Sequence, residues 1–257
     1  MAGRSARDRA SLAVRTTLAF GNRLAGRTHR RLVDRTGELP VLMYHRVLED
    51  AVDARGIESG MLVRASTFDR QMGWLGRYFV PTTLGESLLP PSGERVRAAV
   101  TFDDGWRDNL TTAWPILRKH GVRATIFLVR DWVGTQDFLS STEVADLARD
   151  GIEFGAHTVT HPRLPELQDA EIERELRLSR EAVADWTGRP CDTLAYPFGA
   201  HDDRCVAIAE RLFRAAVVVG GGWWRIGVDP HRIPRIAVHE DMTSTEPMFE
   251  ARVAGLA

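Results

Sequence analysis

Cysteine is scarce in this chain, which has only Cys191 and Cys205 among its 257 residues, so a disulfide-stabilised miniprotein is excluded and we expect reduced thiols. Long apolar runs are also missing, since none approaches the roughly 20 residues that a membrane-spanning helix needs. The formal net charge is only −1, which does not favour nucleic acid as the main partner. With 44% hydrophobic and 27% charged residues, the chain has an ordinary globular composition and enough length for one large α/β domain.

The first 36 residues differ from the rest in charge. They hold nine arginines against two aspartates, with leucines at loosely helical spacing. This pattern predicts a basic, possibly helical extension, either docked peripherally on a membrane or a partner, or solvated. Arginines interrupt any apolar segment of a secretory signal, so we expect a protein in the cytoplasm or at the inner membrane surface; organelle transit peptides share this composition. We therefore separate an extension at 1–36 from a domain at 37–257.

From residue 39 onward, short apolar segments alternate with helical patterns. Because strands that alternate with helices form parallel βα units, and polar residues follow several different strands, we predict an α/β fold, a distorted (β/α) barrel of about seven parallel strands. The strands are predicted at 41–44, 96–102, 125–129, 152–156, 193–196, 216–219 and 236–238, and the main helices at 66–79, 140–150, 169–186 and 203–213.

The first polar cluster is Asp103-Asp104-Gly105, directly after the strand at 96–102. Two adjacent carboxylates at the end of a buried strand repel each other unless a cation or a proton offsets the repulsion. The triplet is also a common turn sequence. It indicates either a cation site or a simple turn.

The second cluster is His157-Thr158-Val159-Thr160-His161, which follows the strand at 152–156. Two imidazoles four residues apart can bind one ion. Together with Asp104 they make a set of two histidines and one carboxylate, which holds Zn²⁺ with open positions or Fe(II) for oxygen chemistry. The adjacent Asp103 favours hydrolysis, because a free carboxylate beside the ion can accept a proton from water.

The third cluster is Tyr196-Pro197-Phe198-Gly199 at the end of another predicted strand. Its backbone N–H groups are candidates for holding a developing oxyanion. The alternative is a Pro-Gly turn without a chemical role.

These three motifs, in this order, resemble those of the polysaccharide deacetylase family (NodB-homology domain, carbohydrate esterase family 4), over about residues 39–250. The resemblance implies a distorted (β/α) barrel and metal-dependent removal of acetyl groups from an N-acetylated sugar in a polysaccharide, an oligosaccharide or a lipid-linked glycan. It makes Asp103 the general base and assigns the oxyanion to the Tyr196 amide. It also implies one divalent ion, Zn²⁺ in the first place with Co²⁺, Ni²⁺, Mn²⁺ and Fe²⁺ as alternatives, bound by Asp104, His157 and His161.

The sequence departs from the common family pattern in two ways. An arginine that usually precedes the third motif is replaced by Leu194-Ala195, and Arg235 is the candidate substitute for orienting the base. The usual late histidine strand is not obvious, whereas Leu42-Met43-Tyr44-His45 lies near the start. In this respect the chain is similar to a circularly rearranged branch that includes poly-N-acetylglucosamine deacetylases. That similarity makes His45 the candidate general acid.

Trp106, Trp223 and Trp224 are candidates for lining the sugar pocket, or simply core residues. Two other functions compete with deacetylation: a metal-dependent amidohydrolase for a non-sugar C–N bond, and a non-catalytic carbohydrate-binding protein. Stoichiometric metal distinguishes an enzyme from such a binding protein.

Overall fold

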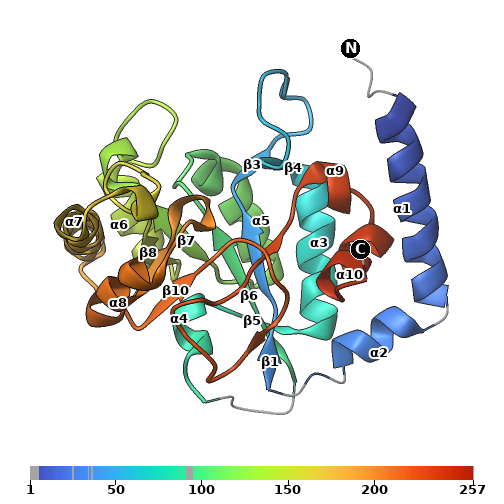
Figure 1. Ribbon diagram of the computed structural model, residues 1–257. Helices are drawn as coiled ribbons and strands as arrows, with labels where there is room; N and C mark the ends of the chain where they lie inside the picture. Colours follow the sequence, from blue (N-terminus) through green and yellow to red (C-terminus); the bar gives the residue numbers. More distant parts are fainter. Residues whose placement is uncertain (1–5, 25, 34, 36, 91–94, 257) are drawn as a thin grey trace.

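The computed structural model describes residues 6–24, 26–33, 35, 37–90 and 95–256 (Figure 1). Its strands are β1 (Glu38–Leu39), β2 (Val41–Tyr44), β3 (Arg46–Leu48), β4 (Leu62–Arg64), β5 (Val80–Thr82), β6 (Arg97–Phe102), β7 (Thr125–Leu128), β8 (Glu153–Ala156), β9 (Thr193–Ala195), β10 (Ala215–Val217), β11 (Trp224–Arg225) and β12 (Ile236–Ala237). Its α-helices are α1 (Ala6–Leu24), α2 (Arg27–Val33), α3 (Ala65–Tyr78), α4 (Leu84–Ser87), α5 (Trp114–His120), α6 (Ser141–Arg149), α7 (Asp169–Thr187), α8 (Asp203–Leu212), α9 (Glu240–Thr243) and α10 (Glu246–Val253).

The main sheet is parallel throughout and runs in the order β10-β9-β8-β7-β6-β2-β12, with β5 paired to the first half of β6. The two edge strands of this sheet, β10 and β12, are brought together by the segment that precedes β12. There the Val218 N–H donates to the Ile233 carbonyl at 2.9 Å, and the Ile233 N–H donates to the Ala216 carbonyl at 3.0 Å. The sheet thus curls into a distorted (β/α) barrel, which confirms the predicted fold class.

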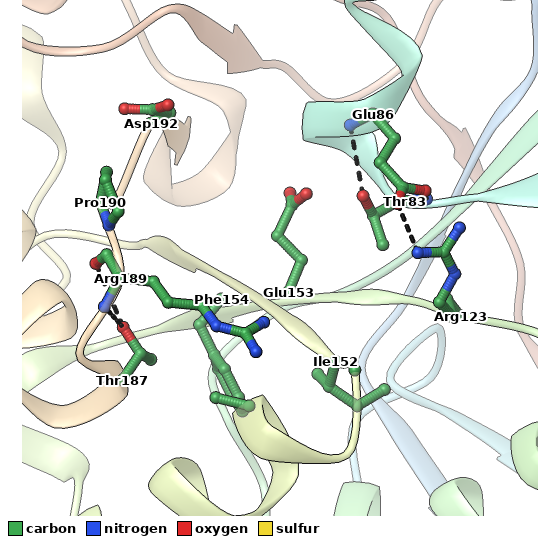
Figure 2. Close-up of a pocket in the computed structure, with 12 residues that line it drawn as sticks. Thr83, Glu86, Arg123, Ile152, Glu153, Phe154, Thr187, Arg189, Pro190 and Asp192 are labelled. Carbon is green, nitrogen blue, oxygen red and sulfur yellow. Dashed lines mark hydrogen bonds and ion pairs between the residues drawn. The ribbon is translucent and has the colours of Figure 1, made fainter.

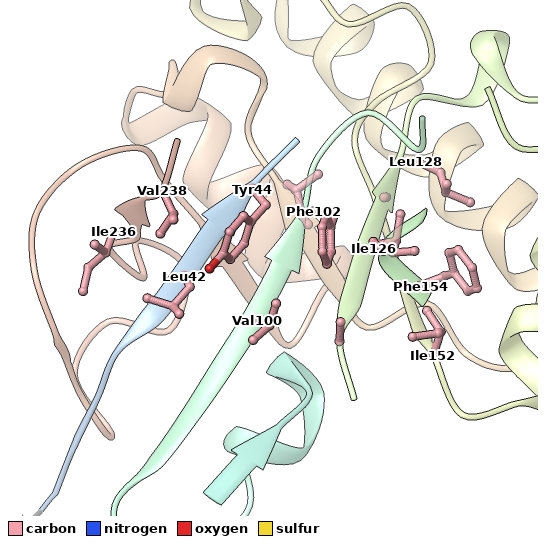
Figure 3. Packing of buried hydrophobic residues seen from close by; sticks show 14 of the residues in the cluster. Leu42, Tyr44, Val100, Phe102, Ile126, Leu128, Ile152, Phe154, Ile236 and Val238 are labelled. Atoms are coloured by element: carbon pink, nitrogen blue, oxygen red, sulfur yellow. The ribbon is translucent and has the colours of Figure 1, made fainter. Parts of the chain in front are cut away.

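The outer face of the barrel carries the main hydrophobic core. Figure 3 shows buried side chains from neighbouring strands lying together along this face. Tyr44 of β2 stacks on Phe102 of β6 with 5.5 Å between ring centroids, and Phe68 of α3 meets both rings edge-on. These contacts anchor α3 on the sheet beside the ends of β2 and β6, where the polar residues follow.

The inner face of the barrel is lined by a second, smaller cluster that includes Val41 and Ala99. Because successive residues of a strand point to opposite faces, Thr101 follows Ala99 on the inner side of β6 and Asp103 continues the same period. The alternation that sends Phe102 outward into the core therefore directs the Asp103 side chain into the mouth of the barrel.

The long helices begin and end where local sequence signals predict. Ser140 caps α6, with its hydroxyl accepting from the Glu143 N–H and the Glu143 carboxylate accepting from the Ser140 N–H. The helix α7 ends at Gly188, which has a φ of 65° and so adopts the left-handed conformation that glycine favours. These signals are local, which is why the sequence predicted both helices to within two residues.

The basic N-terminal segment forms α1 and α2, which stand at one side of the barrel next to α10 (Figure 1). Arg23 of α1 makes ion pairs with Glu246 at 3.1 Å and Glu250 at 3.2 Å. On α1, Val14 and Leu18 are 60% and 61% exposed. Within the described ranges, no helix combines the length and the apolar character that crossing a membrane requires.

Candidate active site

Polar side chains gather where the parallel strands end. Asp103 and Asp104 follow β6, His157 follows β8, and His45 follows β2, the strand that pairs with β6. The carboxyl ends of parallel strands meet at one edge of a barrel, so residues that are distant in sequence become neighbours there. This edge holds most of the side chains that the sequence analysis assigned to a single site.

Asp104, His157 and His161 converge closely enough to share one ion. One potential ligand atom from each lies within 4.8 Å of the others. The Asp104 Oδ1 atom is 3.6 Å from His157 Nε2 and 3.7 Å from His161 Nε2. Two imidazole nitrogens and a carboxylate oxygen are the donor set of catalytic zinc sites that keep a position open for water or substrate. The residues therefore fit a divalent cation.

Neighbouring groups fix the orientation of these side chains. The Nδ1 atom of His157 lies 2.7 Å from the Ala195 carbonyl oxygen, which requires the proton on Nδ1 and leaves Nε2 free to bind an ion. The Trp106 Nε1–H donates to Asp104 Oδ2 at 3.0 Å, which leaves Oδ1 toward the histidines. Burial and the neighbouring His157 lower the pKa of His161 to about 4, so this imidazole is neutral at pH 7, the form that binds metals.

The backbone is strained at this site. Asp104, Thr158, His161 and Phe198 have φ angles of 76°, 68°, 63° and 59°, a region that residues with a side chain rarely adopt. Among the described residues, only Asp229 is a further non-glycine position with positive φ. Such strain persists where the surrounding structure enforces it, and it gathers at functional sites. The strained residues belong to all three motifs, which marks this edge of the barrel as the candidate functional site.

A glutamate from a neighbouring helix holds the loop between the two histidines. Glu175 of α7 accepts hydrogen bonds from the Val159 N–H at 2.7 Å, the Thr160 N–H at 3.0 Å and the Thr160 hydroxyl at 3.1 Å. The sequence alone does not single out Glu175, because it looks like one of several solvated glutamates along a helix. Only the packing of α7 against the end of β8 reveals its role.

Asp103 lies beside the three ligand candidates and is bound by an arginine instead. Arg235 Nη1 donates to Asp103 Oδ1 at 2.6 Å, and Nη2 donates to Oδ2 at 2.7 Å. Nη1 also donates to the Thr101 hydroxyl at 3.2 Å. Both charged side chains are almost completely buried. Arg235 thus occupies the position that the sequence analysis suggested for it.

The ion pair decides the protonation state of Asp103. Burial by itself raises the pKa of this carboxyl, because the charged form loses its hydration. The positive charge and hydrogen bonds of Arg235 outweigh burial and hold the pKa well below its ordinary value. Asp103 is therefore a carboxylate at neutral pH, able to accept a proton.

His45 lies next to this carboxylate, with its Nε2 atom 4.0 Å from Asp103 Oδ2 and its side chain 18% exposed. The Asn109 side-chain amide donates to the His45 carbonyl at 2.9 Å and fixes the backbone there. A second histidine, His239, follows β12, the neighbour of β2 in the sheet. Burial lowers the pKa of His239, and its Nδ1 atom is buried without a hydrogen-bond partner among the described residues.

The turn at Tyr196-Pro197-Phe198-Gly199 offers a different backbone donor from the one the sequence predicted. The Tyr196 N–H donates to the Val217 carbonyl at 3.2 Å, so the pairing of β9 with β10 already engages it. Pro197 has no N–H, and the Gly199 N–H donates to the Tyr196 carbonyl at 2.8 Å. The Phe198 N–H has no partner within the described part of the chain. This amide replaces that of Tyr196 as the candidate donor.

The three tryptophans do not share one location. Trp106 contacts Asp104 at the site, as described above. Trp224 belongs to β11, which pairs with β1 at the opposite end of the barrel, and its indole N–H donates to the Val228 carbonyl. Trp223 packs on Phe79, just before β5. Trp223 and Trp224 thus lie where the strands begin, at the end of the barrel away from the metal-ligand cluster, and of the three candidates only Trp106 lies at the site.

A surface cavity of about 360 Å³ also lies at that opposite end. Figure 2 shows Glu153, the first residue of β8, pointing into it, with an ion pair between Arg123 and Glu86 at its wall. The Glu153 carboxylate is already bound by the Gly85 N–H and the Thr125 hydroxyl. This cavity therefore does not compete with the metal-ligand cluster as a catalytic site.

Comparisons with known proteins agree with this geometry. A family model described as polysaccharide deacetylase matches residues 92–216. The Bacillus subtilis protein YxkH is 29% identical over 187 residues, which cover 69% of this chain and 63% of YxkH. The poly-beta-1,6-N-acetyl-D-glucosamine N-deacetylase of Staphylococcus aureus is 26% identical over 201 residues, 70% of this chain and 68% of that protein.

Solved structures give the same result. A polysaccharide deacetylase from Bacillus cereus is 27% identical and superimposes with a TM-score of 0.75, covering 84% of this chain and 69% of the other.

This chain spans less than two thirds of YxkH, and its match covers only 26% of the Listeria monocytogenes peptidoglycan-N-acetylglucosamine deacetylase. With the barrel and the three motifs assembled at one edge, these matches show that the chain is similar to the polysaccharide deacetylase family.

Proposed function

We propose that the protein is a metal-dependent N-deacetylase that hydrolyses the acetamide of an N-acetylated sugar and releases acetate. This proposal rests on one observation: the two adjacent carboxylates, Asp103 and Asp104, have different partners. Asp104 turns to His157 and His161, whereas Asp103 is held separately by Arg235. A ligand set with an ionised, uncoordinated carboxylate beside it is the arrangement that hydrolysis needs.

Asp104, His157 and His161 would hold the divalent ion, with Zn²⁺ the first choice because neutral imidazoles and a carboxylate suit it. When bound, such an ion polarises the acetamide carbonyl and makes water more acidic. The Trp106 indole binds Asp104, and the Ala195 carbonyl binds His157. These hydrogen bonds orient two of the three ligand candidates, which supports the proposal.

The other residues of the site supply proton transfer and charge stabilisation. Asp103 accepts a proton from the water that attacks the acetamide carbon, and Arg235 keeps this carboxylate ionised and aimed. The Phe198 N–H donates to the developing oxyanion. His45, when protonated, donates to the sugar nitrogen as the C–N bond breaks, because an amide anion is a poor leaving group. The products are acetate and a free amino sugar.

The printed activity of the Staphylococcus aureus relative supports a poly-N-acetylglucosamine-like glycan as the substrate class. We also propose that α1 makes peripheral contact with an anionic membrane, because Val14 and Leu18 project from a helix rich in arginine. Sedimentation with anionic vesicles tests that contact. Leu18→Glu should release the protein, and unchanged sedimentation of this variant would rule the contact out.

The decisive test of the activity is acetate release from N-acetylglucosamine oligomers, with a chelator and after restoration of metal. We expect turnover that the chelator abolishes and Zn²⁺ restores. Cleavage of simple amides but not of sugars would favour the amidohydrolase alternative. A protein without turnover and without stoichiometric metal would be a carbohydrate-binding relative instead.

A further inference from the structure

Two aromatic rings contact His161 of the metal-ligand cluster, one tilted against it and the other edge to face. The Trp132 ring lies 5.1 Å from the His161 ring, and the Phe198 ring lies 4.6 Å from His161 on another side, measured between centroids. The guanidinium carbon of Arg163 lies 4.5 Å from the centroid of Phe198. The Phe198 ring therefore lies between the Arg163 guanidinium and His161, a ligand candidate. We expect a sugar whose acetamide binds at this cluster to come within reach of Arg163.

Arg163 differs from the other arginines around this edge in having no acidic partner. Arg46 pairs with Asp108 at 2.8 Å, Arg130 with Asp131 at 3.2 Å and Arg107 with Glu143 at 3.7 Å. Arg163 is exposed, and within the described ranges its side chain makes no hydrogen bond or ion pair, while its backbone carbonyl accepts from the Glu166 N–H. Its guanidinium lies over the ring of Phe198, and among the described residues none binds its N–H groups, which leaves them available to an anion.

The ring under Arg163 is itself held in an unusual way. Phe198 is 54% exposed, although it is a large apolar residue, and its φ of 59° places it in the left-handed region. The chain thus maintains a strained backbone that presents an exposed ring beside the site. A ring that carries an arginine on one part of its face makes a platform on which a sugar and an acidic substituent can bind together.

We propose that Arg163, stacked on Phe198, is a specificity-determining residue that binds an anionic oxygen group, a carboxylate or a phosphate, on the acetylated sugar or on the sugar next to it. A planar guanidinium binds such groups through two parallel hydrogen bonds, and stacking on an aromatic ring fixes its plane before the substrate arrives. This inference rests on the proposed deacetylase activity and specifies, among N-acetylglucosamine glycans, those that carry an acidic substituent.

The experiment compares kcat/KM for acetate release from three N-acetylglucosamine oligomers of equal length. One is neutral, one carries a carboxylate on the neighbouring sugar and one carries a phosphate there. We expect the wild-type protein to prefer one or both acidic substrates over the neutral one. Arg163→Gln should lower kcat/KM for the preferred substrate about tenfold or more, mainly through KM, and leave the neutral substrate unchanged. The acidic oligomer whose kcat/KM falls more in Arg163→Gln, the one with the carboxylate or the one with the phosphate, identifies the group that Arg163 binds.

Two further variants separate recognition from a structural role. Arg163→Lys keeps the charge without the planar fork and should retain part of the preference, and 0.5 M salt should reduce the preference in the wild type. Arg130→Gln removes a nearby arginine that is already paired and should change nothing. A wild-type protein that cleaves all three oligomers equally well, or an Arg163→Gln variant that loses activity equally on all of them, overturns this inference but not the proposed function. Absence of cleavage of every oligomer by the metal-loaded wild type overturns both.

Discussion

Arg235 and Asp103 are 132 positions apart in the sequence, yet they form two hydrogen-bonded ionic contacts of 2.6 and 2.7 Å in the mouth of the barrel. The pair joins β6 to the segment that closes the sheet before β12. Removing one member of a buried pair leaves an uncompensated charge and typically costs about 3–5 kcal/mol of folding free energy. The same contact serves stability and keeps ionised the carboxylate that we propose as the general base.

Arg235→Gln should therefore change the pH dependence of catalysis. Without the arginine, burial dominates and the pKa of Asp103 rises, so a larger fraction of the carboxyl is protonated at a given pH. The acidic limb of the kcat/KM profile should move to higher pH, with a fall of about 10²-fold in kcat from lost positioning. Arg235→Lys keeps a positive charge and should move the limb less. An unchanged profile in Arg235→Gln would show that another group controls the acidic limb.

The features that could be predicted from the sequence alone are those that depend on residues close together in the chain. Asp103, Asp104, His157 and His161 could be predicted because each follows a recognisable buried strand within a short motif. The Tyr196 amide could not be judged in this way, since its engagement depends on β10, a strand that lies farther along the chain.

The same distinction explains the other outcomes. Trp224 follows a glycine-rich segment without clear periodicity, and only the pairing of β11 with β1 places it at the far end of the barrel. Arg163 closely follows the second predicted motif and Phe198 belongs to the third, but their stacking depends on how the loops after β8 and β9 fold together. Elements, caps and ligand candidates were thus predictable, whereas contacts between loops were not.

Asp103→Asn should retain the metal and lose nearly all turnover. Asparagine has nearly the same shape but cannot accept the proton from water, and the three ligand candidates are untouched. Metal content by elemental analysis and acetate release by a coupled assay measure the two effects. Asp131→Asn, at an exposed aspartate nearby, is the matched control and should behave like the wild type. Substantial turnover by Asp103→Asn would remove Asp103 from the role of base.

His157→Ala should lose metal first and activity as a consequence. This histidine is almost fully buried and offers one of the three candidate ligand atoms, so its removal leaves only two of them to hold the ion. Metal content after dialysis against a weak chelator checks the prediction. His120→Ala serves as the control, because His120 pairs with Asp69 between α5 and α3 and should leave metal content unchanged. Full metal occupancy in His157→Ala would show that the ligand set is different.

Glu175→Gln should weaken metal binding although Glu175 is not a ligand. Its two carboxylate oxygens accept three hydrogen bonds from the loop that carries His161, and an amide can replace only some of them. Loss of an outer partner of this kind typically costs about 10–100-fold in metal affinity. Competition with a fluorescent zinc chelator measures the change. Glu173→Gln, on the same helix and paired with Arg211, should bind metal like the wild type. Equal affinity in the two variants would show that the loop holds its shape without Glu175.

Gly199→Ala should impair catalysis without loss of metal, because it displaces the turn that carries the Phe198 amide. A Cβ atom at Gly199 would lie 2.6 Å from the backbone nitrogen of Val219 and 2.8 Å from its Cβ, so the turn must shift. Loss of an oxyanion donor typically costs about 10²–10³-fold in kcat. Gly188→Ala is a matched control, since Gly188 has a similar φ of 65° but no atom within 4 Å of the added Cβ. Both variants bear the strain of a left-handed alanine, and only Gly199→Ala should lose turnover. Equal kcat in the two variants, at equal metal content, would show that the Phe198 amide does not hold the oxyanion.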